Sequence, residues 1–148
     1  MKRILITGGA GFIGSNAAVF FSRKGWDVMV LDDLSRRGSR ANLAWLSQKT
    51  NLRFEQVDVR NVAATENVVR DFRPDVLLHL AGQVAVTTSV KNPRTDFDTN
   101  ALGTFNMLEA VRAHTPECFF INISTNKVYG EMPGVVVPRA PSAMNTGT

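Results

Sequence analysis

The segment KRILITGGAGFIG, from Lys2 to Gly14, joins a short apolar run to three regularly spaced glycines. A segment with a helical pattern, SNAAVFFSRKG, follows it directly. We interpret this order as a strand, a tight turn and a helix. In such a unit Gly8 allows the sharp exit from the strand, and Gly14 lets the helix pack close to it. Gly11 leaves space for a ligand to reach the backbone.

The start of the expected helix is suited to a phosphate group. Its first N–H groups have no partner within the helix, and the helix dipole is positive there. An acidic residue, Asp32, ends the next apolar run, roughly 20 residues on, as in a dinucleotide-binding unit. A glycine turn without any ligand is the alternative interpretation. We expect a dinucleotide site at this turn.

Short apolar runs alternate with helical patterns along the chain. The runs expected to form strands are residues 4–6, 28–31, 54–57, 76–80 and 119–123, and the expected helices are residues 15–25, 40–49, 61–72 and 93–113. Strands that are apolar throughout and separated by helices are typical of a parallel sheet covered on both faces. Right-handed crossovers then predict an α/β fold with a doubly wound parallel sheet, a Rossmann fold with strand order 3-2-1-4-5.

Composition bounds the class of protein. Hydrophobic residues make up 44% and charged residues 20% of the 148 residues, as in an ordinary soluble domain. The net charge of +4 comes from scattered basic residues, so we expect no nucleic-acid partner. The single cysteine, Cys118, excludes an internal disulfide and predicts no metal site. Without a signal peptide or a membrane-length apolar run, we expect a cytoplasmic protein that does not contact a membrane.

The second expected strand ends in Asp32 and Asp33, which indicate the choice of dinucleotide. A carboxylate at this strand tip accepts hydrogen bonds from the adenosine ribose and repels a 2′-phosphate, which favours NAD over NADP. Arg36 and Arg37 favour NADP instead, because guanidinium groups can bind the 2′-phosphate. The carboxylate stands at the strand tip, so we predict NAD as the cofactor.

The ends of the third and fourth expected strands carry further candidates. Asp58 follows the third strand, where capping of the next helix is the alternative to a cofactor contact. After the fourth strand, small Ala81 and Gly82 let the backbone approach a cofactor, and Gln83 begins a polar loop. His79 lies inside that apolar strand, and we interpret it as a core histidine and not as a catalytic base.

Several motifs together resemble one enzyme family. TGGAGFIG is similar to the turn of the extended short-chain dehydrogenase/reductase family, which modifies sugar nucleotides. The segments DDLSRRGS, HLAGQVAVTTSVKNP, STNKVYG and the N-x-x-G-T motif of residues 100–104 resemble the CDP-paratose 2-epimerase (CDP-tyvelose epimerase) group. The similarity extends from Met1 to about Met132.

The resemblance implies a chemistry and a set of site residues. Such enzymes hold NAD tightly, take a hydride from sugar C2 and return it to the opposite face, so the expected partner is a nucleotide sugar, suspected to be a CDP-sugar. Thr125 would bind the sugar hydroxyl that is oxidised, although a turn that ends the strand is its alternative role. The cofactor residues implied by the motif and the resemblance are Gly8, Gly11, Phe12, Ile13, Gly14, Asp32, Asp33, Leu34, Ser35, Arg36, Asp58, Val59, Leu80, Ala81, Gly82, Gln83 and Asn100.

Two departures from the family pattern limit the expectation. Dehydratases of the family place Asp-Glu after the threonine, where this chain has Asn126 and Lys127. The family's Tyr-x-x-x-Lys dyad, which removes the hydroxyl proton, is missing as well, because the fourth residue after the only tyrosine, Tyr129, is Pro133. The resemblance therefore argues against dehydration and for a chain that is inactive by itself.

We expect an amino-terminal portion of an enzyme. Residues 1–132 would form an incomplete NAD-binding domain and residues 133–148 a proline-rich, partly disordered tail, with the later strands and the C-terminal substrate lobe absent. Val135–Val137 would be an edge strand or an apolar patch. The full-length protein would be a homo-oligomer. Another sugar-nucleotide epimerase, an NAD(P)-dependent reductase or a non-catalytic dinucleotide sensor are the alternatives.

Overall fold

The computed structural model describes residues 1–124, and the predictions for Thr125 and for residues 126–148 lie outside this part of the chain. Its strands are β1 (Arg3–Thr7), β2 (Asp27–Asp32), β3 (Arg53–Gln56), β4 (Val76–His79) and β5 (Phe119–Asn122). Its helices are α1 (Phe12–Arg23), α2 (Ser39–Lys49), α3 (Val62–Phe72), α4 (Val86–Lys91), α5 (Pro93–Phe97), a π-turn η1 (Asp98–Leu102) and α6 (Gly103–His114).

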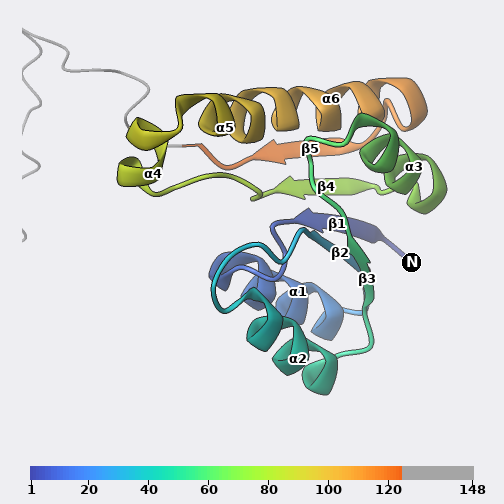
Figure 1. Ribbon diagram of the computed structural model, residues 1–148. Coiled ribbons are helices and arrows are strands. Elements are labelled where there is room, and N and C mark those ends of the chain that lie inside the picture. The colour runs from blue at the N-terminus through green and yellow to red at the C-terminus, as the bar shows by residue number, and fades with distance from the viewer. Residues whose placement is uncertain (125–148) are drawn as a thin grey trace, which may run out of the picture.

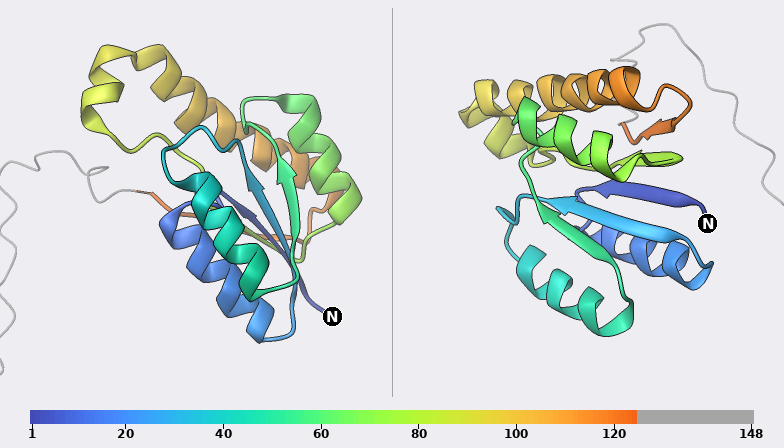
Figure 2. Two further views of the ribbon diagram at one scale, coloured as in Figure 1. Left: turned by 60° about the horizontal axis from the view of Figure 1, so that its bottom comes forward. Right: turned by 90° about the vertical axis from the view of Figure 1, so that its right-hand side faces the viewer.

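The strands form one parallel sheet with the order β3-β2-β1-β4-β5, which confirms the predicted topology. Helices α1 and α2 cover one face of the sheet, and α3, α5 and α6 lie over the other (Figure 1). The right-hand view in Figure 2 shows the helices on either side of the sheet. The order reverses between β1 and β4, so the crevice expected of this fold opens beside the turn that follows β1.

The core divides into two apolar layers, one on each side of the sheet. Along β1, Ile4 and Ile6 face α1 and α2, whereas Leu5 faces α3 and α6. All three side chains are fully buried. A strand buried on both faces explains why the amino-terminal run is apolar at every position and does not alternate.

Local signals for the helix ends hold in the structure. Asn61 caps α3, where its side-chain oxygen accepts a hydrogen bond from the Ala64 N–H at 3.1 Å. Pro93 occupies the first turn of α5, and Gly25, with φ of +77°, follows the end of α1. None of the helices within residues 1–124 is both long and apolar enough to cross a membrane.

The structure adds detail to two expectations. The helix expected over residues 93–113 forms, but the π-turn η1 inserts a wider turn in it, between α5 and α6. The loop expected to begin at Gln83 contains the short helix α4. A helix as short as α4 does not give a periodic apolar pattern, so the sequence has no signature for it.

Candidate functional site

A cleft opens at the carboxyl ends of β1, β2 and β4, beside the turn that joins β1 to α1. Its volume is about 330 Å³. Its lining residues are Gly8, Gly11, Leu31, Asp32, Asp33, Ser35, Arg36, Ser39, Val57, Asp58, Val59, Arg60, Leu80, Ala81, Gly82, Gln83, Thr88, Thr95 and Thr99. Most of the residues that the sequence predicts for a cofactor therefore border one cleft, although they come from four separate segments of the chain.

The glycine turn forms one wall of the cleft, and Gly8, Gly9 and Gly14 are packed too tightly for a side chain. A Cβ atom at Gly8, whose φ is +64°, would lie 2.8 Å from the Ala81 nitrogen. A Cβ atom at Gly14 would lie 2.6 Å from the Cα of Gly9. At Gly11 a Cβ atom would meet only the Gly8 carbonyl oxygen, at 3.0 Å. Gly8 and Gly14 are thus required by the fold, whereas the surroundings of Gly11 are comparatively open.

The start of α1 has no capping group of its own. No side chain accepts a hydrogen bond from its first N–H groups, and its first turn contains no acidic residue. The side chains of Phe12 and Ile13 point outward, with 82% and 61% of their surface exposed. These residues can therefore contribute backbone N–H groups, and the helix dipole adds positive potential, which together suit the pyrophosphate of a dinucleotide.

Asp32 is the most buried acidic group of the cleft. One carboxylate oxygen accepts a hydrogen bond from the Ala10 N–H at 3.0 Å, and the other accepts one from the Leu34 N–H at 2.8 Å. Burial raises the pKa of Asp32, while these two N–H groups oppose the rise. The carboxylate is thus held in one orientation at the strand tip, where it retains free lone pairs for ribose hydroxyls.

The neighbours of Asp32 build the rest of this corner. The Asp33 carboxylate accepts hydrogen bonds from the backbone N–H and the hydroxyl of Ser35, at 2.9 and 2.7 Å. Leu34 has a positive φ of 59°. Arg36 also lines the cleft, so a positive charge stands beside the two carboxylates.

Asp58 borders the opposite side of the cleft and does not cap α3. Its carboxylate accepts a hydrogen bond from the backbone N–H of Arg60 at 2.9 Å. The Nε–H of Arg60 lies 3.0 and 2.9 Å from the two carboxylate oxygens and donates to both. The Arg60 guanidinium lowers the pKa of Asp58. Asn61 caps α3, so Asp58 does not have the capping role that was the alternative to a cofactor contact.

The loop from Leu80 to Gln83 forms the third wall and is held by Asn100 of η1. The Asn100 side chain accepts a hydrogen bond from the Gln83 N–H at 2.7 Å and donates one to the Gln83 carbonyl at 3.0 Å. A Cβ atom at Gly82 would lie 3.1 Å from the Asn100 side-chain oxygen. Asn100 thus contacts the loop that borders the cleft, although it does not line the cleft itself.

His79 is a core histidine, as the sequence predicted. Its ring is 1% exposed and is hydrogen-bonded through both nitrogens, to Thr7 at 2.7 Å and to Thr104 at 3.1 Å. Burial lowers its pKa to about 4. The residue is outside the cleft lining.

Several predicted residues adjoin the cleft without lining it, and some lining residues were not predicted. Phe12, Ile13, Gly14 and Leu34 belong to the glycine turn, the start of α1 and the Asp32 corner, and Thr125 lies outside the described residues. Unpredicted lining residues include Ser39, Arg60, Thr88, Thr95 and Thr99. The last three come from α4, α5 and η1, whose arrangement the sequence did not indicate.

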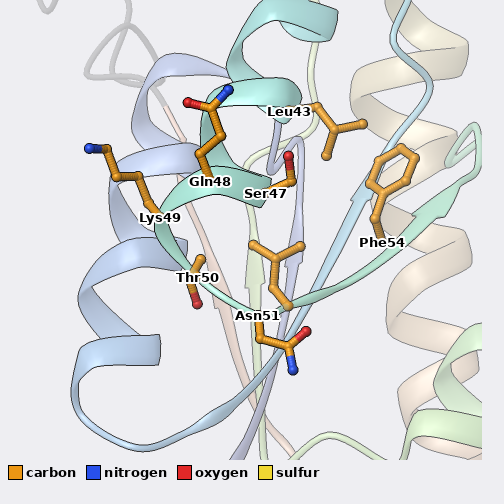
Figure 3. Close-up of a pocket in the computed structure, with 8 residues that line it drawn as sticks. Leu43, Ser47, Gln48, Lys49, Thr50, Asn51 and Phe54 are labelled. Carbon is orange, nitrogen blue, oxygen red and sulfur yellow. The ribbon is translucent and has the colours of Figure 1, made fainter.

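A larger groove of about 580 Å³ lies between the end of α2 and the start of β3 (Figure 3). Leu43, Leu52 and Phe54 contribute its apolar side chains. It opens at the amino end of β3, away from the glycine turn, whereas parallel sheets of this topology bind ligands at the carboxyl ends of their strands. Within residues 1–124 no three His, Cys, Asp or Glu side chains gather as metal ligands.

Comparison with known proteins identifies one matching family model and similar nucleotide-sugar enzymes. The family model described as GDP-mannose 4,6 dehydratase matches residues 5–139. CDP-paratose 2-epimerase of Salmonella typhi is 49% identical over 88% of this chain and 38% of its own length. dTDP-glucose 4,6-dehydratase of Neisseria meningitidis is 37% identical over 97% of this chain and 44% of its own length.

A solved structure agrees in fold as well. UDP-glucose 4-epimerase from Bifidobacterium longum, in complex with NAD+ and UDP, superposes with a TM-score of 0.79 at 32% identity, over 87% of this chain and 38% of that one. The chain thus spans about two fifths of the length of these relatives. The resemblance predicted from the motifs is confirmed: the chain belongs to the GDP-mannose 4,6 dehydratase family of NAD-dependent epimerases and dehydratases.

Proposed function

We propose that this chain binds NAD and forms the cofactor-binding portion of a nucleotide-sugar epimerase. The observation that carries the proposal is the pairing of an uncapped helix start with a fixed carboxylate, Asp32, across one cleft. These groups match the two ends of an adenosine diphosphate, because amides suit the pyrophosphate and a carboxylate suits the ribose. The NAD+ complex of the related 4-epimerase supports the assignment.

Each wall of the cleft would have a separate task. The N–H groups at the start of α1 would bind the pyrophosphate, and Asp32 would accept the ribose hydroxyls. Asp58 and Val59 would border the adenine, and the Leu80–Gln83 loop would pass under the nicotinamide half. When bound, NAD would accept a hydride from the sugar and return it, so that the reaction inverts a carbon without net oxidation.

Within this class we propose a 2-epimerase that acts on a CDP-sugar. The identity of 49% to a CDP-paratose 2-epimerase supports this substrate. The dehydratase relative favours dehydration as a second candidate, yet Asn126 and Lys127 replace the acidic pair that dehydration needs. Thr125 would orient the sugar hydroxyl. We further propose that the complete protein is a cytoplasmic homo-oligomer and that the 148-residue chain alone has no turnover.

The first test is cofactor choice, measured by calorimetric titration of NAD+ and NADP+. We expect the chain to bind NAD+ at least tenfold more tightly. Asp32→Asn should weaken NAD+ binding by about 10- to 100-fold, which is the effect of losing a charged hydrogen-bond acceptor. Arg36→Ala should weaken the residual NADP+ binding. Arg37→Ala is the matched control, because Arg37 does not line the cleft. Equal or tighter binding of NADP+ by the unmodified chain would refute the assignment.

A further inference from the structure

His79 ends β4 and connects the glycine turn to the π-turn region, although it borders no part of the cleft. Its Nδ1 lies 2.7 Å from the Thr7 hydroxyl, in the residue that precedes Gly8. Its Nε2 lies 3.1 Å from the Thr104 hydroxyl, at the start of α6. The imidazole therefore joins the end of β1 to the start of α6.

The hydrogen-bond pattern fixes the tautomer of this ring. The Thr104 hydroxyl donates its only hydrogen to the Asn100 carbonyl at 2.7 Å, so it must accept a hydrogen bond from Nε2–H. A neutral imidazole with its proton on Nε2 leaves Nδ1 as an acceptor, and the Thr7 hydroxyl donates to it. The Thr7 hydroxyl thus donates to His79, and the Thr104 hydroxyl donates to the Asn100 carbonyl.

Both partners of His79 act on the same loop. The Thr7 oxygen accepts hydrogen bonds from the N–H groups of Leu80 and Ala81, at 3.1 and 3.2 Å. At the other end of the loop, the Asn100 side chain binds both backbone groups of Gln83. The Thr104 hydroxyl donates a hydrogen bond to the backbone carbonyl of Asn100, which lies in η1.

We propose that His79 is a positioning residue, whose imidazole fixes the Leu80–Gln83 loop against the glycine turn and so sets the width of the cofactor cleft. The proposal rests on the proposed NAD site for its functional consequence. The margin is small, because a Cβ atom at Gly8 would lie 2.8 Å from the Ala81 nitrogen and leave no space between the two walls. A loop released from Thr7 and Asn100 would shift into or away from the space of the cofactor.

The test breaks the relay at three points and compares each variant with a matched control. His79→Phe removes both hydrogen bonds, and Thr104→Val removes one hydroxyl at nearly constant volume, which protects the test if the first variant does not fold. Thr104→Ser keeps the hydroxyl and should restore the unmodified behaviour. Thr65→Val is the control, because Thr65 is also buried and its hydroxyl bonds only to backbone carbonyls of α3.

Thr104→Val removes the hydrogen bonds of the hydroxyl to His79 and to the Asn100 carbonyl, and we expect it to raise the NAD+ dissociation constant by about tenfold. Thr65→Val should lower the melting temperature without changing that constant. In two-dimensional ¹H–¹⁵N NMR spectra without cofactor, the amide signals of Ala81 and Gln83 should move in Thr104→Val and return in Thr104→Ser. The ring ¹⁵N shifts of His79 should show a proton on Nε2.

The outcomes separate the two proposals. If the unmodified chain does not bind NAD+, the proposed function fails, while the amide signals still decide whether His79 positions the loop. If those signals and the NAD+ affinity stay unchanged in Thr104→Val, or if the proton lies on Nδ1, the positioning proposal is overturned.

Discussion

At the scale of single residues, the glycines of the turn have different roles: Gly14 is required for packing, whereas Gly11 leaves space for the ligand. Gly14 lies against the backbone of Gly8 and Gly9, which cannot give way easily. Gly11 has φ of −74°, a conformation open to any residue, and its environment is less crowded. The motif treats the three glycines alike, but the structure assigns them different tasks.

The same substitution at these two positions should therefore have opposite effects. Gly14→Ala should destabilise the fold by about 1–3 kcal/mol or more, the usual effect of overpacking. Gly11→Ala should change stability little but abolish NAD+ binding, because its methyl group would occupy space at the pyrophosphate. Urea unfolding and NAD+ titration measure the two effects. Undiminished NAD+ affinity in Gly11→Ala would place the cofactor elsewhere.

His79 should make stability depend on pH in a defined window. Its pKa is about 4 in the folded chain against an ordinary value of 6.5, so between these values the unfolded chain binds a proton that the folded chain does not. The free energy of unfolding should fall as the pH is lowered from 6.5 to 4, by about 3 kcal/mol in total.

Urea unfolding at pH 7, 6 and 5 measures this decrease, and His79→Gln should lack the corresponding part of it. Other groups, including Asp32 with its raised pKa, contribute equally to both proteins, so the difference between them isolates His79. The same slope in both proteins would show that His79 titrates normally.

At this scale the sequence predicts several residues that line the cleft, because they stand at or just after the ends of apolar runs. Asp32 ends β2, and Asp58 and Ala81 follow the ends of β3 and β4, so the topology of the parallel sheet brings them to one edge. Thr88 and Thr99 could not be found in this way, because they reach the cleft through helices whose geometry depends on tertiary contacts.

At the scale of elements, the junction between η1 and α6 packs against two segments that line the cleft. The π-turn directs Asn100 toward Gln83, and directly after it Gly103 packs on Val59, which lines the cleft. A Cβ atom at Gly103 would lie 2.7 Å from a methyl carbon of Val59. The sequence marks Gly103 only as part of the N-x-x-G-T motif, and this contact explains why a helix residue there is glycine.

Gly103→Ala tests the contact, because helix propensity and packing predict opposite signs. Alanine is favoured over glycine inside a helix by about 1 kcal/mol. Overpacking against Val59 costs about 1–3 kcal/mol, so we expect net destabilisation. In the double variant Val59→Ala/Gly103→Ala the two effects should not add, because the smaller side chain removes the clash. A stabilised Gly103→Ala protein in urea unfolding would show that α6 can shift freely.

At the scale of the whole molecule, strand order was the most predictable feature. Strands that are apolar throughout and alternate with helices predict a parallel sheet that is covered on both faces. Right-handed connections between the strands then predict the order that the structure shows. The departures, α4 and η1, lie on the segment between β4 and β5, where the chain passes over the cleft. The elements that the sequence pattern did not predict are therefore the ones that lie beside the cleft.

Catalysis is the prediction that concerns the chain as a whole. We expect the 148-residue chain to bind NAD+ but not to invert the C2 carbon of CDP-paratose. The reaction needs a base for the sugar hydroxyl, and general-base assistance is worth about 10²–10⁴ in rate. Tyr129 lacks a lysine at the required spacing, since the fourth residue after it is Pro133. His79 cannot substitute, because both its nitrogens are engaged and its ring is buried.

The measurement is the exchange and inversion of the sugar C2 proton, followed by NMR with NAD+ present. The CDP-paratose 2-epimerase of Salmonella typhi, which is 49% identical over most of this chain, serves as the positive control in the same buffer. We expect inversion in the control and none above background with the 148-residue chain. Steady inversion by this chain would contradict the prediction and direct the search to Lys127 as the base, since the cleft walls from β1, β2 and β4 offer no neutral amine or imidazole among the described lining residues.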